Sequence, residues 1–415
     1  MNLSQCTNNL EMARVFQFDQ TGRGIFGNGA VESVGAQAKW LGAGKVVVLT
    51  DKGIEEAGLV DRVLESLKVA GLGASVYDGI PAEPSMETIR AATAFVKMGR
   101  YDVVIGVGGG SCMDTAKMAA VMQNNPGEPQ DYVCSEEDSL QKGSPMIMIP
   151  TTAGTGSEFS DYSVVIEEGH DGWALKNWWW GKALFADVAI VDPTMTLTCP
   201  PAQTAGSGMD ALSHVVEALM SRLAMPLSDA LALQAVALIS SNLRRAYHRG
   251  EDLEARWAVS LAAAFGGMTI AFPWVNGPAI MGHMTAEALG PRYGIPHGLA
   301  CALVLPYAMD FNLPGCMDKL ALVASAMGVD VRELSLREAA CEAVRAVAEL
   351  MKDCGMCTSL EEHGVVPRED LPGFAEYLVN ERQYLYDMQA TNPRKLTTAN
   401  VTRFLEAMWE GRLGQ

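Results

Sequence analysis

The stretch Val103-Val104-Ile105-Gly106-Val107-Gly108-Gly109-Gly110-Ser111 lies in the first half of this 415-residue chain. Its first five residues form a short apolar run rich in β-branched side chains, which is typical of a buried strand. The glycines end the strand, and residues 114–117 (Asp-Thr-Ala-Lys) then begin a helical segment. A strand that passes through a glycine-rich turn into a helix is a building unit of parallel α/β sheets.

The residues before this stretch predict the same alternation of strands and helices. Residues 45–50 and 74–77 are short apolar runs that predict two more strands. Between them, residues 55–70 predict one helix, because apolar residues recur at helical spacing. Residues 85–98 predict a second helix, with Ser85 as its N-cap. The resulting β-α-β-α-β order predicts a parallel sheet that is covered on both faces.

The second half of the chain has a different pattern. Strand signals continue through residues 146–149 and 188–191 and nearly vanish after Pro200-Pro201, where long helical runs begin. A chain of this length also exceeds one small core. We therefore expect an α/β domain with a parallel sheet in residues 1–197. An all-helical domain is expected in residues 198–415.

Composition narrows the possible partners. The formal net charge of −18 argues against binding to nucleic acid and to anionic membranes, both of which attract basic surfaces. No run of eighteen apolar residues and no signal-peptide pattern is present. Nine cysteines, an odd number, fit reduced thiols better than a disulfide framework. These features predict a cytoplasmic protein whose partner is a small molecule.

Two glycine-rich loops follow predicted strands. Backbone N–H groups of residues 108–111, at the start of a helix, can approach a phosphate closely, although a tight packing turn would also explain the glycines. The second loop is Thr151-Thr152-Ala153-Gly154-Thr155-Gly156-Ser157-Glu158. Asp51 ends the first strand, where a carboxylate can accept a hydrogen bond from a ribose 2′-OH. Asp51 precedes the glycines, which is the reverse of the usual dinucleotide fingerprint.

A possible metal site lies in the second half. Asp210 and His214 are four residues apart, so a helix places both on one face. His283 and His297 would be about 21 Å apart on one continuous helix. The intervening Leu289-Gly290-Pro291-Arg292-Tyr293-Gly294-Ile295-Pro296 contains residues that end a helix and allow a fold-back. One carboxylate and three imidazoles form a ligand set for a divalent transition metal, while the alternative is four structural side chains.

Five motifs, in this order, resemble the iron-containing (group III) alcohol dehydrogenases almost from end to end. They are Gly106-Val107-Gly108-Gly109-Gly110-Ser111 with Asp114-Thr115-Ala116-Lys117, the segment Pro150–Glu158, Gly208–His214, Ile295-Pro296-His297-Gly298, and Thr391-Asn392-Pro393-Arg394. Five motifs in the order of the family are far more specific than any one of them.

The resemblance implies that residues 1–197 form a dinucleotide-binding domain and residues 198–415 a metal-binding and catalytic domain. It implies an NAD-dependent, metal-dependent oxidoreductase that acts on a small primary alcohol or aldehyde, with its metal and nicotinamide in a cleft between the domains. The implied metal ligands are Asp210, His214, His283 and His297. The metal is expected to be Fe(II), with Zn, Mn or Ni as alternatives. The expected cofactor-binding residues are Asp51, Gly108, Gly109, Gly110, Ser111, Asp114, Thr151, Thr152, Thr155, Ser157 and Lys176. A homodimer or larger homo-oligomer is expected.

The chain departs from the family pattern in two places. Many members carry a histidine four residues after the third ligand, where this chain has Glu287. Glu287 shares a helical face with His283, so it is expected to be catalytic, as a proton relay or a partner of the substrate, unless it is a solvated surface residue. The loop Ala82-Glu83-Pro84-Ser85 lacks an asparagine that is common before the proline.

The substrate is the least determined feature. By resemblance, Tyr162 and Trp274 line the substrate pocket, and Lys176 or Arg292 is a candidate for holding an anionic tail. The aromatic run in residues 176–180 is expected to be structural packing rather than a substrate contact. Two alternatives remain open. One is a glycerol-dehydrogenase-like or dehydroquinate-synthase-like enzyme on the same fold, and the other is a non-catalytic nucleotide-binding protein.

Overall fold

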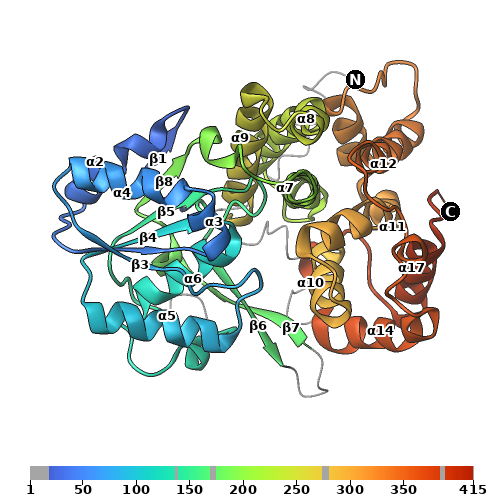
Figure 1. Ribbon diagram of the computed structural model, residues 1–415. Helices are drawn as coiled ribbons and strands as arrows, with labels where there is room; N and C mark the ends of the chain where they lie inside the picture. The colour runs from blue at the N-terminus through green and yellow to red at the C-terminus, as the bar shows by residue number, and fades with distance from the viewer. Residues whose placement is uncertain (1–17, 136–138, 169–173, 273–279, 384–387, 415) are drawn as a thin grey trace. The chain divides into compact units, whose positions relative to one another are not determined.

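A computed structural model describes residues 18–135, 139–168, 174–272, 280–383 and 388–414 (Figure 1). The described chain divides into two compact units. The sheet unit comprises residues 19–200 and 250–271. The helical unit comprises Phe18 and the described residues of 201–249 and 272–414. The division expected from the sequence, into 1–197 and 198–415, remains a prediction.

The sheet unit is built on six parallel strands in the order β1-β8-β5-β4-β2-β3. Their bounds are β1 Gly24–Phe26, β2 Val46–Leu49, β3 Ala74–Tyr77, β4 Val103–Gly108, β5 Met146–Pro150 and β8 Val188–Val191. The glycine-rich stretch thus follows β4, which pairs with β2 on one side and β5 on the other. The predicted parallel α/β sheet is confirmed.

Helices cover both faces of this sheet, as the continuous apolar strands require. Val46 and Val48 of β2 pack in one core with residues of α2 (Val34–Trp40) and α4 (Leu59–Val69). Val47 and Leu49 pack in a second core with residues of α5 (Met86–Gly99) and α6 (Gly110–Val121). Because alternate strand residues face opposite cores, neither face of the sheet is left to water.

One of the predicted helices is divided into two helices in the structure. The expected helix over 55–70 is divided into α3 (Lys52–Glu56) and α4, because Gly58 adopts a left-handed conformation with φ 73° and begins a new helix. By contrast, the helix expected over 85–98 is present as α5. Its predicted N-cap, Ser85, accepts a hydrogen bond from the Thr88 N–H.

The sheet unit also contains a hairpin that the sequence did not predict. Strands β6 (Tyr162–Glu168) and β7 (Ala174–Trp180) pair antiparallel. Trp179 is fully buried and its Nε1 donates to the Pro129 carbonyl at 2.8 Å, while Trp180 Nε1 donates to the Ser135 carbonyl. These contacts support the structural interpretation of the aromatic run.

The described residues of 201–414 contain no strand. Apart from α9 (Leu253–Ile270), which belongs to the sheet unit, the α-helices are α7 Pro201–Met220, α8 Pro226–His248, α10 Met281–Tyr293, α11 His297–Ala326, α12 Leu336–Asp353, α13 Leu360–His363, α14 Leu371–Tyr377, α16 Met388–Thr391 and α17 Thr398–Glu410. This confirms the expected helical second half. Among the described helices, α11 is long and apolar enough to cross a membrane, but 78% of its apolar window is buried, which is typical of a core helix.

Charged side chains are buried where α6 meets the loop that follows β5. Lys117 is fully buried, and its Nζ donates to the carbonyls of Ser160 and Tyr162 at 2.8 and 2.9 Å. Glu158 is 2% exposed, and its Oε2 has no hydrogen-bond partner. Burial raises the pKa of Glu158 to about 7 and lowers the pKa of Lys117 to about 8.

The raised pKa of Glu158 predicts a stability that falls with rising pH. In the unfolded chain a glutamate has a pKa of about 4.3, so the folded protein binds this proton more tightly. The stabilising contribution is full below that pH and is lost as the pH rises through about 7. Because of this group, the free energy of unfolding of the wild-type protein should fall by about 3 kcal/mol between pH 4.5 and 7.5. Glu158→Gln, which mimics the protonated acid, should not show this fall.

Chemical denaturation across this pH range measures the effect. Glu56→Gln, at an exposed glutamate of the same unit, should keep the wild-type pH dependence. An unchanged slope in Glu158→Gln would show that Glu158 ionises normally in the folded protein.

Candidate active site

Helix α7 presents Asp210, His214 and Glu217 on one face, because these residues are spaced four and three apart. All three are buried, with exposures of 2%, 5% and 1%. A helix that buries two carboxyl groups and an imidazole needs partners for them within the unit. Those partners come from α10 and α11.

The predicted break between His283 and His297 is present. Helix α10 ends at Tyr293 and is capped by Gly294 in a left-handed conformation with φ 68°, and α11 begins at His297 after Pro296. The chain therefore folds back between the two histidines. Asp210 Oδ1 lies 3.9, 3.5 and 3.6 Å from the Nε2 atoms of His214, His283 and His297, respectively. The structure thus brings together the four side chains that the sequence selected.

The glycine at 298 allows α11 to approach the backbone of α7 at this point. A Cβ added to Gly298 would lie 2.5 Å from the carbonyl carbon and oxygen of Gly206. That separation is shorter than real Cβ contacts allow, so a side chain at 298 would push the two helices apart. Gly298 follows His297 directly, and the close approach consequently holds His297 beside Asp210.

Glu217 fixes the orientation of His283. Its Oε1 lies 3.0 Å from His283 Nδ1, and its Oε2 accepts from the His283 backbone N–H at 3.0 Å. A Cβ at Gly282 would meet Glu217 Oε1 at 2.2 Å, so the glycine makes room for this carboxylate. With the proton on Nδ1, the lone pair of Nε2 faces Asp210, as in metal-ligating histidines. Sequence reasoning missed Glu217, although its place on the Asp210–His214 face was a signal.

The electrostatics of the cluster suit a bound cation. Burial opposes ionisation of Asp210, but the surrounding imidazoles, His214 first, outweigh it and hold the pKa of Asp210 well below its usual range. Burial lowers the pKa of His214 to about 4, so this imidazole is neutral at pH 7. Asp210 Oδ1 is buried and has no hydrogen-bond partner. A buried carboxylate oxygen that faces imidazole nitrogens without a donor is well suited to bind a metal ion.

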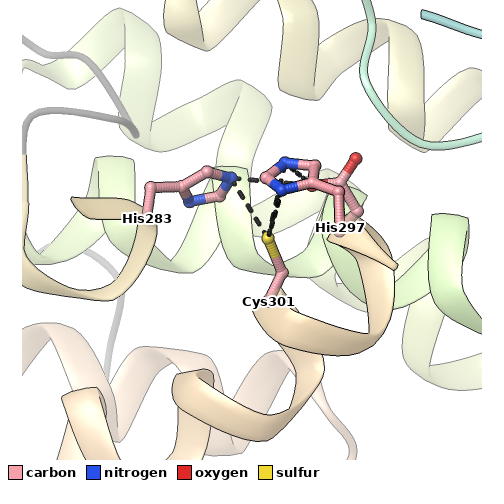
Figure 2. Close-up of side chains that lie close together, drawn as sticks. His283, His297 and Cys301 are labelled. Carbon is pink, nitrogen blue, oxygen red and sulfur yellow. Dashed lines mark hydrogen bonds and ion pairs between the residues drawn. The ribbon is translucent and has the colours of Figure 1, made fainter. Parts of the chain in front are cut away.

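Cys301 is a second residue that sequence reasoning missed. It lies one turn after His297 on α11, and Figure 2 shows its sulfur pointing between the rings of His283 and His297. Donor atoms of Asp210, His283, His297 and Cys301 all lie within 4.8 Å of one another. The i,i+4 relation to His297 was the signal that was available in the sequence.

Glu287 is not a solvated surface residue. It is 6% exposed and its Oε2 forms an ion pair with Arg382 Nη2 at 4.0 Å. Arg382 is 2% exposed and comes from the π-helix η8 (Leu378–Arg382). Burial raises the pKa of Glu217, and the charge of Glu287 adds to this effect. Glu287 is therefore close to the carboxylate that orients His283, while its expected catalytic role remains a prediction.

In the sheet unit, the two glycine-rich loops adjoin each other. Gly109 caps the N-terminus of α6, and the Thr151 N–H donates to the Gly108 carbonyl at 2.9 Å. Cβ atoms at Gly109 and Gly110 would meet Thr152 and Thr155 at 3.4 and 2.8 Å. The backbone of the first loop therefore lies against the threonines of the second, at the ends of two neighbouring strands.

The side chains of these loops differ in what they contact. The Asp114 carboxylate accepts from Ser157 Oγ and the Val164 N–H, so it ties α6 to the second loop and to β6. Ser111 Oγ donates to the Ala82 carbonyl. Asp51 caps α3 by accepting from the Ile54 N–H at 2.9 Å, and it also accepts from the Cys112 thiol. Asp51 lies near the loop, since a Cβ at Gly108 would be 3.9 Å from its Oδ2.

The expected substrate residues are less informative. Tyr162 stacks on Trp180 with ring centroids 6.4 Å apart. Lys176 is 8% exposed and lies 3.6 Å from Glu83. The guanidinium of Arg292 lies 5.5 Å from the ring centre of Phe374. Trp274 falls outside the described residues.

Comparison with known proteins decides the family. Residues 21–193 match the sequence profile "Iron-containing alcohol dehydrogenase", and residues 204–409 match "Fe-containing alcohol dehydrogenase family, C-terminal". The chain belongs to the iron-containing alcohol dehydrogenase family. The resemblance inferred from the five motifs is thereby confirmed.

Three known proteins illustrate the similarity. Long-chain-alcohol dehydrogenase 1 of Geobacillus thermodenitrificans is 36% identical over 389 residues, which cover 93% of this chain and 95% of the relative. The structure of an alcohol dehydrogenase from Oenococcus oeni has a TM-score of 0.88 at 32% identity, covering 95% of this chain and all of that one. A sulfoacetaldehyde reductase from Bifidobacterium kashiwanohense, solved with NAD+, has a TM-score of 0.82 at 26% identity, covering 95% and 99%.

The contact between Glu217 and His283 generates a test. Glu217→Gln supplies one acceptor oxygen instead of two, so it cannot satisfy both N–H groups of His283 and loosens the ring. We expect the affinity for a divalent metal to fall by roughly 10- to 100-fold with the fold retained, measured by competition with a chelator. Glu349→Gln, at an exposed glutamate of the helical unit, is the control. Equal affinity in the two variants would mean that Glu217 does not orient a ligand.

Proposed function

We propose that this protein is an NAD(H)-dependent alcohol dehydrogenase or aldehyde reductase. Its divalent metal is held by Asp210, His214, His283 and His297. The observation that carries the proposal is the buried Oδ1 of Asp210, which lies within 3.9 Å of three imidazole nitrogens and has no hydrogen-bond partner. Membership of the family supports the reaction class.

The bound metal supplies Lewis acidity, which lowers the pKa of an alcohol and polarises an aldehyde carbonyl. The protein prepares this chemistry with one negative carboxylate, Asp210, and an imidazole, His214, that is neutral at pH 7. Glu217 fixes the tautomer of His283. Burial of Asp210 and His283 (2% and 1% exposed) excludes water and strengthens every electrostatic interaction at the site.

The cofactor proposal rests on the sheet unit. The backbone of Gly108, Gly109 and Gly110, at the positive N-terminus of α6, is suited to bind a pyrophosphate. Asp51 lies beside this loop, and its carboxylate would accept from a ribose 2′-OH and repel a 2′-phosphate. NAD(H) is therefore proposed over NADP(H). The relative from Bifidobacterium kashiwanohense was solved with NAD+, which supports this choice.

The proposal also covers the identity of the metal, the substrate class, the oligomeric state and the location of the protein. Fe(II) is proposed as the metal on the basis of the family, with Zn, Mn or Ni as alternatives that the same donor set accommodates. The substrate is proposed to be a small primary alcohol or aldehyde. Lys176 and Arg292 are the candidates for holding an anionic tail, such as the sulfonate named in a relative. A cytoplasmic homodimer or larger homo-oligomer is proposed, and each described cysteine is a free thiol.

The proposal is tested by removing and restoring the metal. NADH and NADPH oxidation would be followed with short aldehydes that carry neutral, anionic and cationic tails, before and after chelation. Metal-free protein should lose at least about 100-fold in turnover, because Lewis acidity contributes several kcal/mol. Fe(II) or another divalent ion should restore it, with NADH preferred. The same assay would include glycerol and dehydroquinate-pathway substrates. Turnover of one of these would indicate a related enzyme on the same fold.

Substitution at the site gives the matched comparison. His283→Ala should lose both metal content and turnover, whereas His248→Ala, at an exposed histidine of α8, should retain both. Full turnover in metal-free protein would contradict the assignment. Absence of turnover with every aldehyde, despite bound metal and NADH, would favour a non-catalytic nucleotide-binding protein.

A further inference from the structure

The Asp51 carboxylate accepts hydrogen bonds from donors on two different helices. Its Oδ1 caps α3 by accepting from the Ile54 N–H at 2.9 Å. Its Oδ2 accepts from the Cys112 thiol at 3.3 Å. Cys112 lies in the first turn of α6, directly after the glycine-rich loop, and is 1% exposed. The proposed function assigns recognition of a ribose to Asp51, but it leaves the contact with Cys112 unexplained.

The glycine-rich loop leaves room for the thiol to reach Asp51. Strands β2 and β4 pair in parallel, so the segments that follow them lie side by side at the carboxyl edge of the sheet. A Cβ at Gly108 would lie 2.5 Å from Cys112 Sγ and 3.9 Å from Asp51 Oδ2. Because Gly108 has no side chain, the sulfur packs against the loop backbone and contacts the carboxylate. Cys112 thus connects the candidate phosphate-binding turn to the candidate ribose-binding residue.

The Cys112 thiol is a hydrogen-bond donor at neutral pH. Burial, together with the negative charge of Asp51, raises the pKa of Cys112 well above its usual range. The proton therefore stays on the sulfur. A thiol is a weak donor to neutral groups, but hydrogen bonds to an ionised carboxylate are stronger than those between neutral groups.

Donors on both oxygens fix the plane of the Asp51 carboxylate. A carboxylate oxygen accepts more than one hydrogen bond, so acceptor capacity remains for a ribose hydroxyl. A carboxylate held in one orientation binds that hydroxyl with little further loss of rotational freedom. Held in this way, it also keeps its charge where a 2′-phosphate would lie. Without the thiol, the bond to Ile54 holds one oxygen and no longer fixes the other.

We propose that Cys112 is a positioning residue of the dinucleotide site, which acts through Asp51 to favour NAD(H) over NADP(H). This inference rests on the cofactor assignment of the proposed function. It adds a determinant of cofactor choice that is itself buried.

Two substitutions that differ only in the donor test this role. The dissociation constants of NADH and NADPH would be measured by fluorescence titration of the full-length protein. Cys112→Ala removes the donor, so the ratio of the NADPH constant to the NADH constant should fall by at least about threefold, mainly through weaker NADH binding. Cys112→Ser keeps a donor at this position and should preserve most of the ratio. Cys199→Ala, at a half-buried cysteine of the same unit, should keep the wild-type ratio. An equal ratio in Cys112→Ala and Cys112→Ser would assign Cys112 to packing alone and overturn the proposal.

A double-mutant cycle shows whether the effect passes through Asp51. Asp51→Ser keeps an N-cap oxygen for α3 but removes the carboxylate, so it should lower the same ratio. In Asp51→Ser protein, Cys112→Ala should cause no further fall, because the group that it orients is already gone. The same fall in both backgrounds would overturn the action through Asp51 and leave the proposed function intact. An unchanged ratio in Asp51→Ser would contradict the role of Asp51 in the proposed function, and the inference would fall with it.

Discussion

The helical unit depends on one buried charge, the carboxylate of Asp210. A carboxylate without compensation is costly to bury, so the chain must surround it with partners. It does so by bringing His214 from the same helix and His283 and His297 from two others to within 3.9 Å of one oxygen. This constraint determines where α7, α10 and α11 meet, and it explains why the chain folds back so sharply after Gly294.

The supporting residues show how that meeting point is held. Gly298 lets α11 approach the backbone of Gly206 on α7 closely, and Gly282 leaves room for the Glu217 carboxylate that orients His283. A Cβ at Gly298 or at Gly282 would displace a candidate ligand or its partner. Side chains carried on rigid helices, with their rings fixed by neighbouring carboxylates, are held more tightly than side chains on loops.

Much of the fold and site could be predicted because the determining signals are local. The short apolar runs identified every strand of the parallel sheet except β1, and the i,i+4 pair at Asp210 with the Gly294–Pro296 break identified the donors that converge. The misses have physical reasons. The helix break at Gly58 depends on a single backbone conformation, and β6 and β7 pair through residues that carry no clean alternation. Which side chains face the site, Glu217 and Cys301 included, depends on packing between helices distant in sequence.

The proposed function requires that the donors around Asp210 bind a single divalent metal. Anomalous X-ray diffraction from crystals of metal-loaded protein, recorded on both sides of the metal's absorption edge, tests it most directly. One strong anomalous peak per chain is expected within about 2.0–2.3 Å of donor atoms of Asp210, His214, His283 and His297. A loaded, catalytically active crystal with no peak at this position, or with its metal elsewhere, would contradict it.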